Sequence, residues 1–257
     1  MFSPEERDRY ARHIMLKEIG GAGQQRLKAA TVALVGVGGL GAPAALYLAA
    51  AGLGRLRLID DDQVSLSNLQ RQILYVSSDV GADKTARAAE HLRALNPHVV
   101  IEARRSRLAD ANAASLLAGA DLVLDGSDSF ATRFCVNAAC HDAGLTLISG
   151  AVGRWTGQVA TFKSGQTRTS PMGERLPCYR CFVPEAPPNA ETCAEVGVVG
   201  ALTGVIGTLM ALEAIKEIAR AGESLAGRLL IFDGLEATSR TVQLPVDPAC
   251  PVCAAPP

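Results

Sequence analysis

Short runs of β-branched and aliphatic residues alternate with longer helical segments along the first 150 residues. Five runs read as strands buried on both faces, because they are mostly apolar and end at turn-forming or acidic positions. These runs are 31–36, 55–60, 98–103, 121–125 and 145–149. Helical patterns separate them at 41–51, 83–95, 110–118 and 129–143. The alternation predicts βαβ units and an α/β fold with a mostly parallel, Rossmann-like sheet.

The two ends of the chain have a different pattern. At the start, Ser3 has the form of an N-cap, with Pro4 in the first turn and Glu6 at the capping-box position, so a helix is expected over 3–19. After residue 150 the expected elements are a strand at 157–162, a loop at 163–177, a helix at 202–220 and strands at 229–232 and 239–244.

Composition narrows the class of protein. The 257 residues are 48% hydrophobic and 20% charged, with 25 Lys and Arg against 26 Asp and Glu. Such a chain is too apolar to be disordered, and it lacks the basic excess of a non-specific nucleic-acid binder. Its start is charged, unlike a signal peptide, and glycines interrupt the uncharged runs 31–54 and 196–212. We therefore expect a cytoplasmic protein with reduced cysteines, bound neither to a membrane nor to nucleic acid.

A glycine-rich turn joins the first expected strand to its helix. The glycines of the GVGGLG sequence are Gly36, Gly38, Gly39 and Gly41. Without Cβ atoms, these positions let backbone N–H groups and a helix N-terminus approach a phosphate. Asp60, at the end of the second strand, is placed to accept hydrogen bonds from a ribose. The pattern predicts a nucleotide site, although such a loop serves NAD, FAD and ATP alike and can also serve helix–strand packing alone.

A polar stretch after the second strand is more specific. The sequence DDDQVSLSNLQRQ at 60–72 is similar to the D-x-D-x-V-x-x-S-N-L-x-R-Q motif of the MoeB/ThiF family of E1-like adenylyltransferases. The family's other motifs occur in the same order, with RYAR at 9–12, a lysine at 84, LDGSD at 124–128 and PCYRC at 177–181. The chain resembles this family over nearly its whole length, most closely the MoeB branch.

The resemblance implies a reaction that the polar residues suit. Members use ATP to adenylylate the C-terminal glycine carboxylate of a ubiquitin-like sulfur carrier, which ends in Gly-Gly, and release pyrophosphate before a thiocarboxylate forms. An anionic carboxylate must approach an anionic α-phosphate, so cations and Mg²⁺ are needed to offset the charge. Arg71 and Lys84 suit the phosphates, and Asp128 is the natural ligand for Mg²⁺. No general base is required, because the attacking carboxylate is already ionised.

The resemblance also assigns roles to further polar residues. It gives the ribose to Asp60 and makes Asp62 an additional acidic residue of the site, and Asn68 is suited to bind phosphate or ribose. Arg12 resembles an arginine that family members supply across a dimer interface to the γ-phosphate, which implies a homodimer. For each of these residues the plain alternative is an exposed salt bridge.

One position departs from the family pattern. Relatives usually follow the magnesium aspartate with asparagine, whereas Ser129 follows Asp128 here. Serine is a good N-cap, so we expect the start of the next helix to survive the change. A hydrogen bond made by the asparagine side chain would be lost.

The cysteines predict a metal site. Cys178 and Cys181 form one C-x-x-C pair, and Cys250 and Cys253 form another. Four thiolates in two such pairs are typical of a closed, structural zinc site rather than a disulfide. Cys193 matches the position of the family's conjugating cysteine; it is either that residue or an idle thiol.

These expectations combine into one organisation. We expect a single E1-like adenylation domain over 1–257, with a nucleotide-binding half at 1–150. Carrier-docking, zinc and crossover elements at 151–257 are expected to form an antiparallel, zinc-bound extension at the C-terminal end. Because the chain ends at Pro257, shortly after the second cysteine pair, we expect no rhodanese segment and a separate sulfur donor such as a cysteine desulfurase.

Two other functions stay open at this point. A nicotinamide-dependent oxidoreductase would explain the glycines and Asp60 but would leave Arg71, Lys84 and Asp128 without a role. A non-catalytic scaffold that binds a ubiquitin-like protein is supported only by the departure at Ser129. The pathway of the carrier, whether molybdopterin, thiamine or tRNA thiolation, is not fixed by the sequence.

Overall fold

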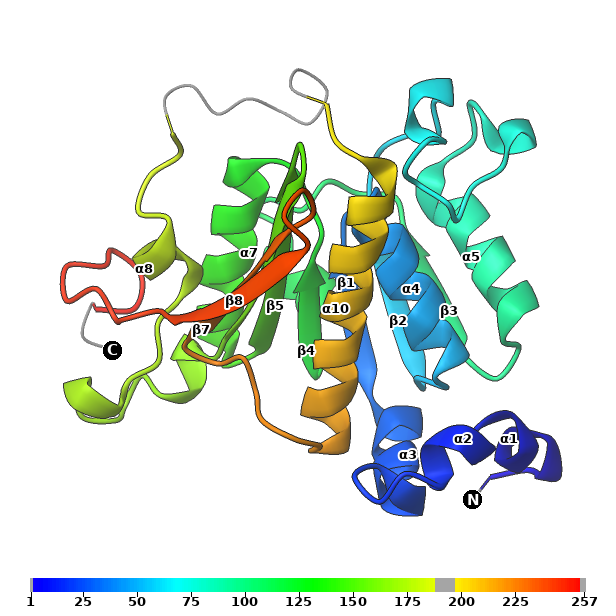
Figure 1. The fold of residues 1–257 in the computed structure, drawn as a ribbon, viewed down its shortest axis with the longest axis horizontal. Helices are drawn as coiled ribbons and strands as arrows, with labels where there is room; N and C mark the ends of the chain where they lie inside the picture. The colour runs from blue at the N-terminus through cyan, green and yellow to red at the C-terminus, as the bar shows by residue number, and fades with distance from the viewer. Residues whose placement is uncertain (1, 188–196, 255–257) are drawn as a thin grey trace.

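The computed structural model describes residues 2–187 and 197–254. Its centre is an eight-stranded sheet in the order β3-β2-β1-β4-β5-β6-β7-β8 (Figure 1). The parallel strands are β1 (Thr31–Val35), β2 (Arg55–Ile59), β3 (Val100–Arg104), β4 (Leu122–Asp125) and β5 (Thr146–Gly153). The antiparallel strands are β6 (Thr156–Phe162), β7 (Arg228–Asp233) and β8 (Thr238–Gln243). The predicted Rossmann-like sheet with an antiparallel C-terminal extension is confirmed.

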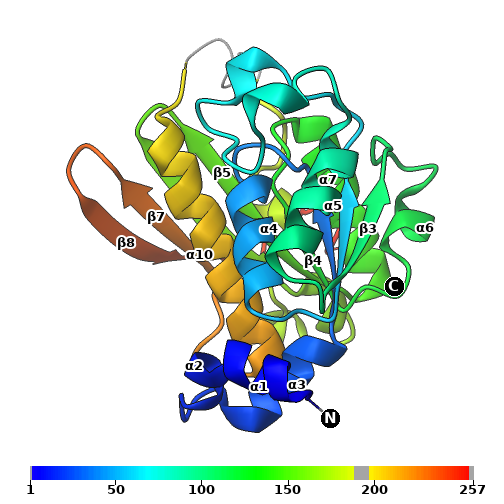
Figure 2. The same ribbon diagram turned by 90° about the vertical axis from the view of Figure 1, so that its right-hand side faces the viewer.

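Helices cover both faces of the sheet (Figures 1 and 2). One face carries α4 (Gly41–Ala50), α5 (Lys84–Leu95) and α10 (Gly200–Ala219). The other carries α6 (Ala113–Leu117), α7 (Phe130–Ala143) and α8 (Tyr179–Phe182). Short 3₁₀ turns are η1 (Leu66–Asn68), η2 (Ser77–Asp79), η3 (Ser164–Gln166) and η4 (Met172–Glu174). The last two lie within the segment 163–177 that was expected to be a loop.

The central strands feed two hydrophobic cores, which explains their unbroken apolar runs. In β1, Val32 and Leu34 pack into the core under α4 and α10, whereas Ala33 and Val35 pack into the core under α7. Side chains of a strand alternate between the two faces of the sheet, so both sets must be apolar when helices cover both faces.

The single N-terminal helix expected over 3–19 is wrong. The predicted capping box is present, because the Ser3 hydroxyl accepts the Glu6 N–H and the Glu6 carboxylate accepts the Ser3 N–H. The helix then breaks into α1 (Pro4–Arg9), α2 (Ala11–Ile14) and α3 (Gly20–Ala29). The break falls at Tyr10, whose ring is buried and whose hydroxyl accepts a 2.9 Å hydrogen bond from Asn96. Tertiary packing of this ring overrides the helical pattern.

The long apolar segment near residue 200 is the N-terminal part of α10. This helix packs against α4, β5 and β6 and buries residues such as Ile206 and Met210 completely. Within the described ranges, none of the helices has the length and hydropathy needed to span a bilayer.

Candidate active site

A cavity of about 400 Å³ opens at the carboxyl end of the parallel strands. It lies where β1 has β2 on one side and β4 on the other, the point at which strand order reverses and ligands bind in open α/β sheets. Eight of the residues predicted from the sequence line it: Gly36, Gly38, Gly39, Asp60, Asp62, Arg71, Lys84 and Asp128. Side chains from the first half of the chain and from α8 share this one space.

The glycines of the loop have different structural roles. A Cβ on Gly41 would lie 2.0 Å from the Gly36 carbonyl oxygen, so this glycine is required for close packing of the loop on α4. Gly36 has φ of +82°, a conformation that other residues avoid. A Cβ on Gly38 would meet nothing nearer than the Gln72 amide at 3.5 Å. Gly38 is therefore the position where absence of a side chain keeps the cavity open rather than the fold intact.

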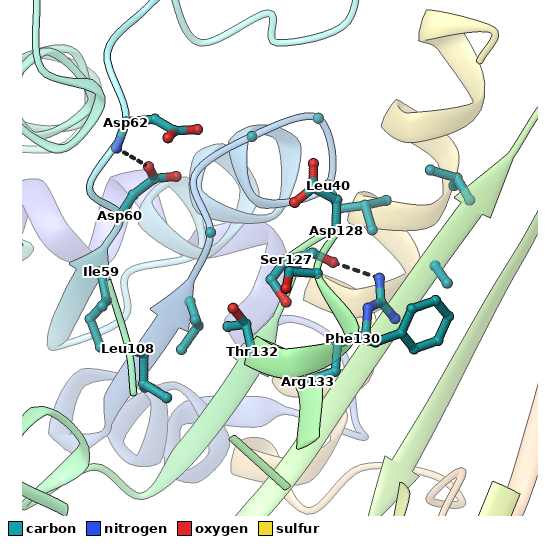
Figure 3. A pocket seen from close by; sticks show the side chains of 18 of the residues that line it. Leu40, Ile59, Asp60, Asp62, Leu108, Ser127, Asp128, Phe130, Thr132 and Arg133 are labelled. Atoms are coloured by element: carbon teal, nitrogen blue, oxygen red, sulfur yellow. Dashed lines mark hydrogen bonds between the residues drawn. The ribbon is translucent and has the colours of Figure 1, made fainter. Parts of the chain in front are cut away.

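Asp60 ties the glycine loop to the acidic segment that follows β2. Its carboxylate accepts the Val37 N–H at 2.7 Å and the Asp62 N–H at 2.9 Å. Burial raises the pKa of Asp60, and these hydrogen bonds together with nearby Lys84 oppose that shift. Figure 3 shows Asp60 at the cavity rim with its carboxylate turned toward Asp62. The remaining lone pairs are suited to ribose hydroxyls.

Lys84 and Arg71 enter the cavity from the two ends of the segment that connects them. Lys84 is the first residue of α5, is 5% exposed and makes a 2.8 Å ion pair with Asp62. A buried cation at a helix N-terminus opposes the helix dipole, so the position costs stability and fits a role in binding anions. Arg71 is half-buried and donates to the Ser67 carbonyl at 3.0 Å.

Asp128 stands at the end of the loop after β4, with its carboxylate exposed to the cavity (Figure 3). A carboxylate in that place, beside phosphate oxygens, is the donor set that Mg²⁺ prefers. Ser129 is the N-cap residue of α7, as expected, but its side chain makes no capping hydrogen bond. The helix begins instead with the Arg133 N–H bonded to the Ser129 carbonyl at 3.0 Å.

Two predicted residues do not line the cavity, and a third lies outside the residues that the structure describes. The Asn68 side chain folds back to accept the Ser65 N–H at 3.2 Å. Arg12 is exposed on α2, at the end of the molecule opposite the N-termini of α4 and α10 (Figures 1 and 2). Within one chain it cannot reach the cavity. Cys193 lies outside the described residues.

The cavity also contains residues that the sequence did not single out. Gln72 is 4% exposed beside Gly38, and its Oε1 has no hydrogen-bond partner among the residues that the structure describes. Arg133 and Tyr179 line the wall on the side of α7 and α8. Gln72 is the last residue of the motif at 60–72, and that membership was its sequence signal. Arg133 lies one helical turn after Ser129, so its only sequence signal was its proximity to a motif residue.

The four predicted zinc ligands come together beside α8, which has Cys178 as its N-cap and contains Cys181. Their sulfur atoms lie within 4.8 Å of one another, with Cys178 and Cys250 at 3.5 Å and Cys181 and Cys253 at 3.3 Å. A disulfide requires about 2.05 Å, whereas a tetrahedral zinc ion with bonds of about 2.3 Å spaces its sulfurs by about 3.8 Å. Hydrogen bonds from Cys178 and Cys253 lower the pKa of Cys181, which favours one thiolate in the cluster. The residues fit a structural zinc ion.

The chain is similar to proteins of one family along most of its length. Residues 10–252 match the model of the ThiF family. The sulfur carrier protein adenylyltransferase of Thermus thermophilus is 46% identical over 98% of this chain and 92% of its own. The molybdopterin-synthase adenylyltransferase of Escherichia coli is 44% identical over 98% of both chains.

A solved structure shares the fold at lower identity. The crystal structure of Escherichia coli MccB with MccA-N7isoASN superposes with a TM-score of 0.83 at 23% identity, covering 99% of this chain and 76% of that one. This likeness supports the architecture alone. Together, the matched family model and the two relatives at more than 40% identity establish that the chain belongs to the ThiF family.

Proposed function

We propose that the protein uses ATP to adenylylate the C-terminal glycine carboxylate of a small ubiquitin-like sulfur carrier, giving a carrier acyl-adenylate and pyrophosphate. Relatives at 44–46% identity are named for adenylyl transfer, one of them to a sulfur carrier protein. The observation that carries the proposal is the convergence of Arg71, Lys84 and Asp128 on one cavity beside the glycine loop.

The residues divide the work of the reaction by their charge. Glycine-loop N–H groups and Asp60 hold the phosphate and ribose of ATP, and the Arg71 and Lys84 cations offset the charge of the transferring and leaving phosphates. Asp128 would hold Mg²⁺, which neutralises phosphate charge when bound. A carboxylate oxygen of the carrier forms the new bond to the α-phosphorus while the bond to the β-phosphate oxygen breaks, and pyrophosphate leaves with that electron pair. No proton needs to move.

A homodimer forms part of the proposal, because Arg12 can contribute to the γ-phosphate only from a second chain. Its exposure at the far end of the molecule supports a role across an interface. Exposed apolar residues that follow it directly on the chain, Met15 and Leu16, offer surface for such a contact.

The second half of the chain has the carrier-facing and metal-binding roles in this proposal. Residues 151–257 contain the zinc cysteines and the α8 wall of the cavity, and Cys193 remains a candidate for a covalent bond to the carrier. A separate sulfur donor, such as a cysteine desulfurase, would convert the acyl-adenylate to a thiocarboxylate.

Carrier-dependent pyrophosphate release tests the function directly. Incubation with ATP, Mg²⁺ and purified candidate carriers should release pyrophosphate and add AMP to one carrier, detected by mass spectrometry. The same carrier without its terminal glycine should give neither product. Tight binding of NAD(H) with no binding of ATP in calorimetry would instead favour an oxidoreductase, and carrier binding without adenylylation would favour a scaffold.

A further inference from the structure

Arg133 is a buried cation without a charged partner in residues 2–187 and 197–254. It is 7% exposed on α7, and no carboxylate oxygen in the described part of the chain lies within 4.0 Å of its guanidinium. The other buried cation of the cavity, Lys84, has Asp62 at 2.8 Å. A buried charge without an opposite charge is costly, so its retention calls for an explanation.

The neighbours of Arg133 position its guanidinium without neutralising it. Nη2 donates to the Ser127 carbonyl at 2.5 Å, and Tyr179 lies close enough for the Arg133 charge to oppose the rise in the Tyr179 pKa that burial causes. The buried carboxylate of Asp125 is engaged elsewhere, accepting from Ser127 Oγ at 2.6 Å and from Ser149 Oγ at 3.2 Å. The neutral Ser127 carbonyl therefore orients the guanidinium, and the charge of the guanidinium remains available to a ligand.

The place of Arg133 separates it from the phosphate cations. It lines the cavity next to Phe130, and Figure 3 shows its guanidinium between that ring and the Ser127 carbonyl, with Asp128 pointing the other way. The wall here is formed by α7 and by Tyr179 and Phe182 of α8. Arg71 and Lys84 come from the segment that follows β2, on the side of the glycine loop. The cavity thus has two cationic sides.

We propose that Arg133 binds the terminal carboxylate of the carrier and holds it for attack on the α-phosphate. This inference rests on the proposed function. A planar guanidinium can bind a planar carboxylate through two parallel hydrogen bonds. A single contact to a phosphate oxygen does not need this geometry. In the reaction one carboxylate oxygen bonds to phosphorus, and the other becomes the carbonyl oxygen of the mixed anhydride. Arg133 thereby offsets the repulsion between two anions and fixes the angle of approach, and its counter-ion is the substrate itself.

The test uses two synthetic peptides that end in Gly-Gly, one with a free carboxylate and one with a C-terminal amide. Each carries an N-terminal fluorophore, and binding to the full-length protein is measured by anisotropy with a non-hydrolysable ATP analogue and Mg²⁺ present. Wild-type protein should bind the acid at least ~10-fold more tightly than the amide, the gain expected of a charged hydrogen-bonded pair. Arg133→Gln should bind both peptides equally, and Arg133→Lys should recover part of the preference.

Matched variants separate this role from others. Arg71→Gln should weaken binding of the ATP analogue but keep the preference for the acid. Thermal unfolding of each variant checks that the fold is intact, and the preference ratio is insensitive to a uniform loss of folded protein. Retention of the preference in Arg133→Gln would overturn the proposal, as would equal binding of both peptides by wild type. Weakened ATP analogue binding with the acid preference intact in Arg133→Gln would assign the residue to phosphate instead. None of these results depends on carrier-dependent pyrophosphate release, so the two proposals fail separately.

Discussion

Lys84 Nζ lies 2.8 Å from the Asp62 carboxylate, so the cation offered to the nucleotide already has a counter-ion before substrate arrives. Lys84 is 5% exposed, whereas the Asp62 side chain is 57% exposed. The aspartate can therefore turn toward solvent while the lysine stays in the cavity. The pair keeps the buried Lys84 ammonium charged, and the ammonium can still exchange the Asp62 carboxylate for a phosphate of the substrate.

Substitution of Lys84 should reduce adenylylation more than substitution of Asp62. Lys84→Met should lower kcat for adenylylation by ~10²–10³-fold, the usual effect of removing one group that stabilises transition-state charge. Asp62→Asn keeps the size of the side chain and should cost less, about 10-fold, mainly in KM for ATP. Steady-state assays of pyrophosphate release check both. An Asp62→Asn loss as large as that of Lys84→Met would mean that Asp62 itself binds a ligand or metal.

Two glycine-to-alanine substitutions in the loop should have different effects, one on the stability of the fold and the other on ATP binding. Gly41→Ala places a methyl 2.0 Å from the Gly36 carbonyl, so it should destabilise the fold, whereas Gly38→Ala meets only ordinary contacts. Gly38→Ala should keep the unfolding temperature within about 2 °C of wild type, because the methyl is accommodated. It should nevertheless weaken ATP binding, because the methyl projects where a phosphate must approach the backbone. Unfolding temperature and ATP calorimetry on the pair give the comparison, and normal ATP affinity in Gly38→Ala would place the phosphates elsewhere.

Zinc should stabilise the wall that holds Arg133. α8 (Tyr179–Phe182) directly follows the zinc ligand Cys178 and contains the zinc ligand Cys181, so loss of metal should loosen Tyr179 beside Arg133 as well as lower stability. Purified protein should contain one zinc per chain, and Cys253→Ser should lower both zinc content and unfolding temperature. Cys135→Ala is the matched control, since burial raises the pKa of Cys135 to about 12 and it lies outside the cluster. Full zinc content in Cys253→Ser would contradict the four-cysteine site.

Acid stability should depend on Asp79, which fastens the segment between Arg71 and Lys84 to α5. Burial alone would raise the pKa of Asp79, but the Val76 N–H and the Arg87 guanidinium at 2.6 Å lower it below its usual value of 3.8. A carboxyl group whose pKa is lowered by folding stabilises the fold at pH values above its pKa in the unfolded state. That stabilisation is lost as the pH falls through the pKa of the folded state. Asp79→Asn should therefore cost about 1–3 kcal/mol at pH 7.

The pH dependence of that loss provides the check. Urea unfolding of wild type and Asp79→Asn at pH 7 and near pH 3 should show a difference that shrinks on acidification, because the stabilisation by the ionised carboxylate falls as the pH drops below the unfolded pKa. Arg105→Gln is a suitable control, as it removes an exposed ion pair to Asp83 and should have little effect at either pH. A constant difference between Asp79→Asn and wild type would show that charge on Asp79 does not carry its stability.

Sequence patterns were sufficient for the sheet and for most of the cavity, because both follow from local rules. Apolar runs placed the parallel strands, and the motif at 60–72 together with Lys84 and Asp128 supplied eight lining residues with the glycines. The N-terminal helix was predicted wrongly because the break at Tyr10 depends on a partner, Asn96, far along the chain.

Arg133 was missed for the same reason. Arg133 stands out only because no carboxylate of the described residues lies near its guanidinium in the folded structure. No sequence pattern reports that absence. Asn68 illustrates the reverse case. It belongs to the most specific motif of the chain, yet its side chain closes a local turn on Ser65 in this structure. Motif membership identifies the neighbourhood of a site, and tertiary geometry decides which side chains reach it.

The distance of Arg12 from the cavity of its own chain leads to a mixing experiment. Arg12→Ala and Lys84→Met should each be nearly inactive as homodimers, because every site lacks one cation. In a mixed dimer, the site with intact Lys84 receives Arg12 from the other chain, so one of its two sites is complete. Random exchange of equal amounts makes half of the dimers mixed, so about a quarter of wild-type activity should return under two-fold symmetry. Mixing Arg12→Ala with Arg12→Ala/Lys84→Met should restore none, and equal recovery in both mixtures would show that Arg12 does not act across an interface.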